Sequence, residues 1–220
     1  MGIKVIVTGA TGMVGEGVLL ECIENPAVGK VLMVNRRPFA LTHAKLKECI
    51  VPDFLQLDEC TAQLTGYDAC FFCAGISSVG LSEAEYTRIT YDITLHFAQK
   101  LADLNRKMVF VYVSGAMTDS SESGRNMWAR VKGKTENALT KLPLKNVYNF
   151  RPGFMKATPG QKNIKSYYGL IGWMYPLLKI LMPNHILTLR EVGLAMVNSV
   201  TEGCNKNVLE AKDIRELANM

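Results

Sequence analysis

Strand-like apolar runs alternate along this chain with segments whose apolar residues recur at helical spacing. Ile3–Val7 is almost wholly apolar, which is typical of a strand buried on both faces of a parallel sheet. From Gly12 to about Asn25 the apolar residues follow a helical period, and Pro26 comes directly after the expected end of the helix. The chain therefore begins with a predicted strand, a tight turn and a helix.

The same alternation continues to about residue 150. A helix is predicted from Ser82 to Asn105, beginning with a capping box of Ser82 and Glu85 and open to a break near Thr90. A later helix is predicted over Arg125–Leu142. The other predicted strands are Val31–Val34, Cys49–Val51, Asp68–Cys73, Met108–Val113 and Val147–Phe150.

This order of elements predicts an α/β fold with a doubly wound parallel sheet, the Rossmann fold, and places ligands at the carboxyl ends of the strands. The length of 220 residues suits one domain over 1–220. Beyond Arg151 the pattern is less regular, so we expect a small C-terminal lobe on the substrate side. Its residues 151–190 are the predicted lid segment.

The first turn, Thr8-Gly9-Ala10-Thr11-Gly12-Met13-Val14-Gly15, matches the dinucleotide-binding fingerprint in its required place between a strand and a helix. Gly9 permits the tight turn, Gly12 lets the backbone approach a pyrophosphate, and Gly15 lets the helix pack close to the strand. The free N–H groups and the positive dipole end of the helix then face the anion. We assign Gly9 and the five residues from Thr11 to Gly15 to cofactor binding; the structural alternative is a glycine-rich turn without a ligand.

The end of the second strand discriminates between cofactors. An NAD enzyme usually carries an acidic residue there, whereas this chain reads Asn35-Arg36-Arg37. An arginine binds a 2′-phosphate through charge-assisted hydrogen bonds, so NADP is favoured over NAD. The alternative is a solvated surface pair, with Arg37 the less engaged because Pro38 follows it. Asp53, with Phe54 beside it, is predicted to meet the adenine ring.

With these residues located, the chain resembles the atypical short-chain dehydrogenase/reductase superfamily, in its NAD(P)-binding, epimerase-like branch. The resemblance covers about residues 3 to 200. The order of its motifs along the chain is specific for the superfamily but says little about the substrate. Besides the glycine turn, the motifs that carry it are Cys73-Ala74-Gly75, Ser114-Gly115-Ala116, Val131-Lys132-Gly133 and Arg151-Pro152-Gly153.

The resemblance implies roles for these positions. Ala74 and Gly75 would line the cofactor riboses, and Lys132 would hold the nicotinamide ribose and lower the pKa of a neighbouring acid. The segment Arg151-Pro152-Gly153-Phe154-Met155 would close over the nicotinamide. Ser114 would polarise the substrate oxygen, with Thr118 as a second candidate. Asp92 falls roughly where many relatives carry an asparagine that supports the active site.

One position departs from the family pattern. The family's general acid is a tyrosine four residues before the lysine, and here that position is Trp128. An indole N–H donates a hydrogen bond but delivers no proton at physiological pH. We therefore list Ser114, Lys132 and Trp128 as the catalytic positions while expecting a broken proton relay. A different helix register, with Trp128 packed in a wall, is one alternative. Another is a substitute acid: Tyr91, Tyr112, Tyr167 or Tyr168.

The remaining composition narrows the function classes. The net charge of +5 comes without a long basic run or a nucleic-acid motif, so an anionic cofactor accounts for it and no nucleic-acid partner is expected. Gly169–Met182 is too short to span a membrane. The aromatic stretch 167–178 suits a small core, a substrate lid, or a patch for a dimer or a membrane surface. The absence of a secretory signal predicts a cytoplasmic protein.

Cysteines and histidines give no site in the sequence. Six cysteines follow no disulfide or zinc spacing, and Cys70 and Cys73 fall on opposite faces of a predicted strand rather than in a redox motif. His43, His96 and His185 lie far apart, so no metal site is predicted.

Two functions follow from the residues and the resemblance. The first is an NADP-dependent oxidoreductase- or epimerase-like protein acting on a small molecule of unidentified structure. The second is an NADP(H)-sensing regulator of impaired catalysis that acts through a protein partner, which Trp128 favours. A homodimer is open in either case.

Overall fold

A computed structural model describes residues 2–164 and 185–220 of the chain, and its centre is one parallel sheet. The chain winds outward from β1 in one direction and then, from β4, in the other, which makes the gap between β1 and β4 the topological switch point. The predicted doubly wound Rossmann sheet is confirmed. In their order across the sheet, the seven strands are β3 (Leu46–Ile50), β2 (Val28–Asn35), β1 (Ile3–Thr8), β4 (Ala69–Phe72), β5 (Val109–Val113), β6 (Asn146–Arg151) and β9 (Val208–Glu210).

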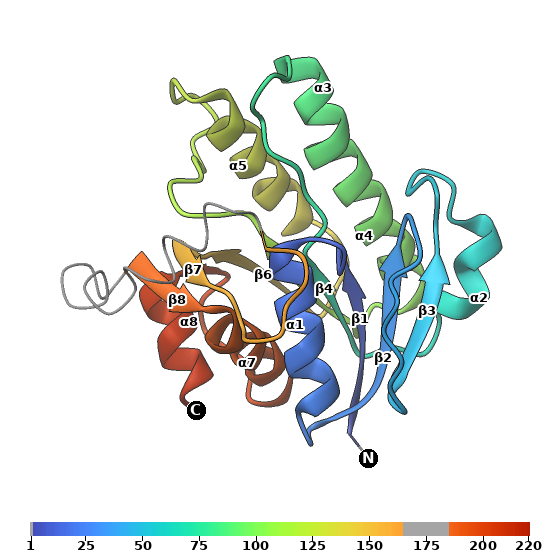
Figure 1. Ribbon diagram of the computed structural model, residues 1–220. Coiled ribbons are helices and arrows are strands. Elements are labelled where there is room, and N and C mark those ends of the chain that lie inside the picture. The colour runs from blue at the N-terminus through green and yellow to red at the C-terminus, as the bar shows by residue number, and fades with distance from the viewer. Residues whose placement is uncertain (1, 165–184) are drawn as a thin grey trace.

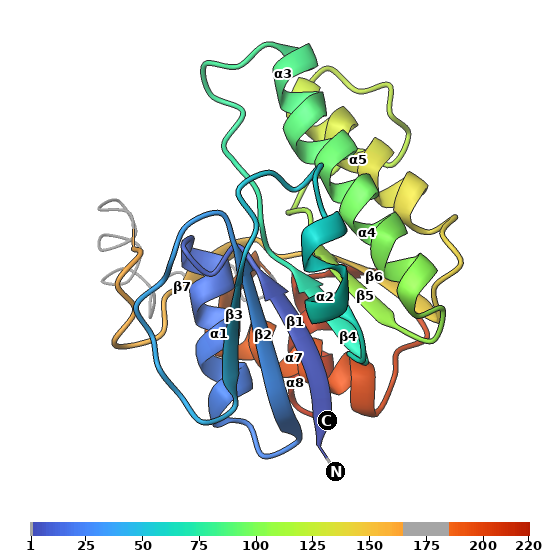
Figure 2. The ribbon, with the colours of Figure 1, turned by 90° about the vertical axis from the view of Figure 1, so that its right-hand side faces the viewer.

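Helices cover both faces of the sheet, as Figures 1 and 2 show. The helices on one face are α1 (Met13–Glu24), α7 (Leu189–Thr201) and α8 (Ala211–Ala218). On the other face lie α2 (Thr61–Leu64), preceded by the short turn η1 (Asp58–Cys60), and then α4 (Ile93–Leu104) and α5 (Met127–Leu139). The strand ends that carry arrowheads in Figure 1 are the carboxyl edge, where the predicted site residues gather.

Alternation along the strands explains the two layers of core. Val5 and Val7 of β1 pack under α1 and α7, whereas Ile6 between them faces α4. Phe71 and Phe72 of β4 divide in the same way, and Phe72 contacts Phe97 of α4 with ring centroids 5.6 Å apart. A strand apolar on every residue is stable only between two covering layers, so the run Ile3–Val7 identified a central strand.

The helix predicted over Ser82–Asn105 consists of three consecutive helical segments. Ser82 caps α3 (Glu83–Thr87) in the predicted capping box, with its Oγ accepting from the Glu85 N–H and the Glu85 carboxylate accepting from the Ser82 N–H. The predicted break near Thr90 is a π-helical turn, η2 (Arg88–Asp92), which leads directly into α4. Turns of this type are frequent at functional sites.

The C-terminal part is more regular than its sequence pattern indicates. β7 (Phe154–Lys156) pairs in parallel with β8 (Ile186–Thr188), and a capping box of Thr188 and Glu191 starts α7. α7 then packs on α1 so closely that a Cβ on Gly193 would lie 2.6 Å from the Cβ of Glu21. Residues 186–220 therefore belong to the main domain, because β9 extends the sheet and α7 and α8 cover it.

Much of the predicted lid segment, including the aromatic stretch 167–178 with Tyr167 and Tyr168, lies outside the described residues. Within the described ranges no helix has both the length and the apolar character needed to cross a membrane.

A buried ion pair ties α5 to the sheet. The Arg151 guanidinium donates from Nε to one Glu136 carboxylate oxygen at 3.0 Å and from Nη2 to the other at 2.5 Å. The Glu136 side chain is 1% exposed, and Arg151 also reaches Glu210 at the end of β9 and Ser120 in the loop before α5. Paired, bidentate and hydrogen-bonded, these charges are satisfied without water.

Breaking this pair is expected to destabilise the fold strongly. Glu136→Ala would remove the buried partner of the guanidinium and leave it the half-exposed Glu210 carboxylate as ion-pair partner, so the free energy of unfolding in urea should fall by about 3 kcal/mol. Glu83→Ala is the matched control, since it breaks the solvent-exposed pair with Arg130 and should cost no more than about 1 kcal/mol. Equal losses in the two variants would contradict this account.

Candidate functional site

The glycine turn has the geometry that phosphate binding requires. Gly9 has a φ of +71°, a conformation that L side chains rarely adopt, and a Cβ there would lie 2.7 Å from the backbone of Ala74. A Cβ on Gly15 would lie 2.2 Å from the Gly9 carbonyl oxygen, so only glycine lets α1 approach β1. Gly12 is the N-cap of α1, with Met13 and Val14 in the first turn, and their orphan N–H groups face the carboxyl edge.

Two buried polar side chains, which sequence reasoning missed, hold this turn to its neighbours. Thr8 Oγ1 accepts from the N–H groups of Cys73 and Ala74, each at 3.2 Å. Asn35 Oδ1 accepts from the Ala10 N–H at 3.2 Å. A threonine ending the first strand and an asparagine ending the second were the available signals, and their bonds join three loops at the switch point.

These loops enclose a pocket of about 330 Å³ at the carboxyl ends of β1 to β4. It brings together eight of the predicted cofactor-binding residues, while their binding role stays a prediction. Ile89 from η2 and Ile93 from α4 close one wall, and no local signal in the sequence could have placed them there. The predicted residues on the pocket wall are Gly9, Thr11, Gly12, Arg36, Asp53, Phe54, Ala74 and Gly75; the others are Val34, Asn35, Pro52, Phe72, Cys73, Ile76, Ile89 and Ile93.

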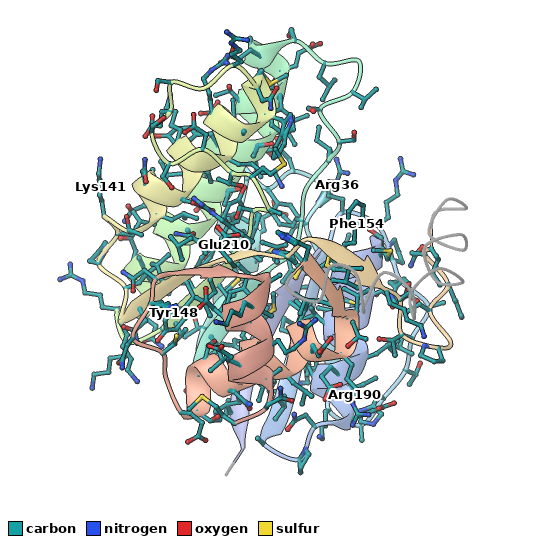
Figure 3. All side chains as sticks on the ribbon, turned by 90° about the vertical axis from the view of Figure 1, so that its left-hand side faces the viewer. Arg36, Lys141, Tyr148, Phe154, Arg190 and Glu210 are labelled. Carbon is teal, nitrogen blue, oxygen red and sulfur yellow. The ribbon has the colours of Figure 1, made fainter. Side chains whose placement is uncertain are left out.

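A second hollow adjoins this pocket and is basic. It is lined by Thr11, Pro52 and the two exposed arginines, Arg36 and Arg37. Within the described ranges neither guanidinium has a carboxylate within ion-pair distance. Figure 3 shows Arg36 in the upper part of the molecule, toward the carboxyl edge, and Arg190 far below it. The hollow can therefore accept an anion beside the pocket.

The predicted catalytic lysine lies beside the end of β5. The Lys132 ammonium donates to the Ser114 carbonyl and lies near Gly115. Burial lowers its pKa to about 8 from 10.5, partly opposed by the Glu136 carboxylate one turn along α5. Trp128 precedes it by four residues on the same helix and is half-buried, so the two side chains share a helical face as expected.

The hydroxyl candidates are engaged with the backbone. Ser114 is 3% exposed and its Oγ donates to the Phe150 carbonyl at 3.1 Å, because the pairing of β5 with β6 continues one residue past the strand. Thr118 Oγ1 donates to the Gly115 carbonyl at 2.8 Å. As placed, neither hydroxyl hydrogen is free to polarise a substrate oxygen, which does not support the role expected of Ser114.

Two of the predicted substitute acids, Tyr91 and Tyr112, lie within the described residues. Tyr112 is buried under α5, and desolvation raises its pKa far above the ordinary value. The centre of the Tyr91 ring, in η2, lies 4.5 Å from the Lys134 ammonium of α5 in a cation–π contact. Asp92 ends η2 and is exposed.

Arg151 is the clearest departure from the expected cofactor contacts. Its guanidinium is held by Glu136, Glu210 and Ser120 instead of reaching the pocket. Side chains alternate across β6, so residue 151 faces α5, and a cofactor contact by the segment that begins at Arg151 stays a prediction. Pro152 accepts from the Ala116 N–H, and Gly153 packs against the His185 backbone.

Cysteine placement agrees with the sequence reasoning. Cys70 packs in the core under α4 and Cys73 against the core under α1, on opposite sides of the sheet. Burial raises the pKa of Cys73 to about 12. Among the described residues no three side chains of histidine, cysteine, aspartate or glutamate form a group that could hold a metal ion.

Known proteins resemble this chain over most of its length. The chain is 27% identical over 188 residues to the mitochondrial protein fmp52 of Emericella nidulans, covering 80% of this chain and 79% of that protein. It is 26% identical over 173 residues to the rat protein HTATIP2, covering 76% and 70%.

Solved structures share the fold at low sequence identity. MoeE5 in complex with UDP-glucuronic acid and NAD superposes with a TM-score of 0.66 at 16% identity, covering 93% of this chain and 74% of that one. The dTDP-glucose 4,6-dehydratase DesIV from Streptomyces venezuelae gives 0.67 at 15% identity, covering 98% and 80%. The model of the NAD dependent epimerase/dehydratase family matches residues 5–136, from β1 to the last turn of α5. The chain belongs to the NAD-dependent epimerase/dehydratase family.

Proposed function

We propose that this protein binds NADP(H) and acts as an oxidoreductase- or epimerase-like enzyme on a small molecule. The observation that carries the proposal is the combination of the phosphate turn, the adenosine-sized pocket and the adjoining basic hollow at one edge of the sheet. When bound, the nicotinamide would donate or accept a hydride.

The residues present fit the 2′-phosphorylated cofactor. Asp53 and Phe54 lie on the pocket wall where an adenine would stack, and Gly12 opens the turn toward a pyrophosphate. The 2′-phosphate of the adenosine ribose would enter the hollow between Thr11 and Arg36. Because no described carboxylate neutralises Arg36 or Arg37, a phosphate there gains charge-assisted hydrogen bonds without displacing a protein partner.

Lys132 would hold the nicotinamide ribose. Its ammonium lies at the end of β5, on the side of the switch point away from the adenosine pocket. A lysine whose pKa is about 8 remains mostly protonated at neutral pH, so it would donate to ribose hydroxyls. The Glu136–Arg151 pair holds the helix that carries it.

The expected substrate is partly apolar. Met117, in the loop after β5, is 76% exposed and has an unusual φ of +66°, and Phe154 at the start of β7 is 52% exposed. The hydrogen bond from the Ala116 N–H to the Pro152 carbonyl brings these two segments together. Apolar groups at the carboxyl edge favour an apolar substrate over a nucleotide sugar.

A regulator that senses NADP(H) through a protein partner is the second candidate. Trp128 favours it, because losing the general acid typically costs about 10²–10⁴-fold in rate. Ser114 and Thr118, bonded to carbonyls, add no replacement proton donor. The two candidates share the cofactor site and differ only in chemistry.

Cofactor choice is tested at Arg36. Arg36→Ala should raise the Kd of NADPH about ten- to a hundredfold and change that of NADH less than about twofold, because only NADPH carries the phosphate. Isothermal titration with both cofactors measures this, with Arg37→Ala as the neighbouring comparison. Equal losses for NADPH and NADH would overturn the assignment.

Catalysis is tested at Trp128. Trp128→Tyr restores an acid one turn before Lys132, so NADPH oxidation with a panel of apolar carbonyl compounds should rise by about 10²-fold or more. Turnover by the unaltered protein would remove the main support for the regulator. If both proteins bind NADPH and neither oxidises it, the regulator is favoured.

The lowered pKa of Lys132 predicts how stability depends on pH. The Lys132 pKa is lowered in the folded chain, so between about pH 8 and 10.5 the unfolded chain binds more protons and the free energy of unfolding rises with pH. Lys132→Met should flatten this rise in urea titrations across that range, whereas Lys134→Met, at an exposed position, should leave it unchanged. A persistent rise in the Lys132 variant would assign it to another group.

A further inference from the structure

Glu16 is a buried carboxylate in the first turn of α1, directly after the phosphate turn. It is 3% exposed, and its two oxygens accept from the backbone N–H groups of Lys162 and Asn163, each at 2.7 Å. In the described part of the chain it has no cation within ion-pair distance. Backbone donors 146 and 147 residues away in sequence therefore satisfy its charge.

This placement has an electrostatic consequence. The positive end of the α1 dipole stabilises the carboxylate, yet the same end is the predicted site of the pyrophosphate. The negative charge of Glu16 would oppose binding of the pyrophosphate at this helix end unless the carboxylate oxygens were held by other hydrogen-bond donors. Because burial of an unpaired carboxylate is costly, Glu16 favours the conformation in which Lys162 and Asn163 remain on it.

The segment that Glu16 holds is 157–163, which follows β7. Gln161 adds to the attachment: its Nε2 donates to the Met13 carbonyl at 2.7 Å, and its Oε1 accepts from the Thr158 N–H at 2.6 Å. The Gln161 side chain thus ties the start of this loop to its end and the loop to α1. This glutamine, 8% exposed, lies against the first residue of α1.

The path of this segment relates it to one half of the cofactor. It leaves the carboxyl end of β6 through β7 and reaches α1 in front of the sheet, as Figure 1 shows. The adenosine pocket lies on the opposite side of the phosphate turn, toward β2 and β3. A dinucleotide bound across the switch point would direct its nicotinamide half toward β5 and β6, next to segment 157–163.

We infer that Glu16 is a positioning residue: it fixes segment 157–163 on α1 so that the segment supports the nicotinamide half of bound NADP(H). The inference rests on the proposed function, because it needs the cofactor. It assigns Glu16 no contact with substrate or with the reacting atoms.

The experiment compares two ligands that differ only at the nicotinamide. NADPH and 2′-phospho-ADP-ribose share the adenosine, 2′-phosphate, pyrophosphate and second ribose. Glu16→Ala should raise the Kd of NADPH about tenfold and leave that of 2′-phospho-ADP-ribose within about twofold, because the segment released from α1 supports only the nicotinamide half. Glu16→Gln, which keeps one acceptor oxygen, should have a Kd for NADPH between those of the unaltered protein and the Glu16→Ala variant.

Controls separate this role from a general effect. Glu24→Ala removes an exposed glutamate at the other end of α1 and should change neither Kd. Gln161→Ala, which loosens the same segment without touching Glu16, should repeat the selective loss for NADPH. In the free protein, hydrogen exchange at the amides of Lys162 and Asn163 should accelerate about tenfold or more in the Glu16→Ala variant.

The outcomes are distinct. Tighter binding of both ligands by Glu16→Ala would show simple repulsion of the pyrophosphate and overturn the inference, as would equal weakening of both. Unchanged hydrogen exchange at the amides of residues 162 and 163 in the Glu16→Ala variant would overturn the inference, and this measurement needs no cofactor. Failure of the unaltered protein to bind either ligand would refute the proposed function itself.

Discussion

The close approach of β1 and α1 at Gly15 is the constraint on which the site depends. With the Gly9 carbonyl oxygen only 2.2 Å from where a Cβ of residue 15 would lie, the first turn of the helix can pass the strand end only with a glycine at this position. That contact sets where the first N–H groups of α1 point. Elsewhere on α1, Gly17 and Gly193 of α7 allow α1 and α7 to approach each other similarly closely. The phosphate turn and the C-terminal packing are therefore parts of one arrangement.

Charges divide into two groups around this arrangement. Arg151, Glu136 and Glu16 are buried and fully occupied by protein partners, so they hold α5 and segment 157–163 in place. Arg36 and Arg37 are exposed beside the pocket, without a carboxylate within reach in the described ranges. Low dielectric rewards complete pairing in the interior, whereas an exposed unpaired cation is available to a ligand.

The structure supports the proposed cofactor binding more fully than the proposed catalysis. The glycine turn and Lys132 both lie within the residues that match the family model, whereas Trp128 stands where a proton donor was expected from the sequence and Ser114 is bonded within the sheet. Binding needs backbone geometry and a few charges, which tolerate changes elsewhere. Proton transfer needs one group of suitable pKa at one place, so a single substitution separates the two properties.

The sequence by itself determined the sheet, the shape of the glycine turn and the place of Arg36 at the end of β2, because these depend on local patterns: apolar runs, glycine spacing and charge at a strand end. It also predicted the capping box at Ser82 and the opposite faces of Cys70 and Cys73. Only the tertiary structure decided that Arg151 pairs with Glu136, that Ile89 and Ile93 line the pocket, and that Glu16 binds residues 162 and 163. Those partners lie 15 to 147 residues apart, or depend on a π-turn that rotates a helix face, and no local pattern encodes such a meeting.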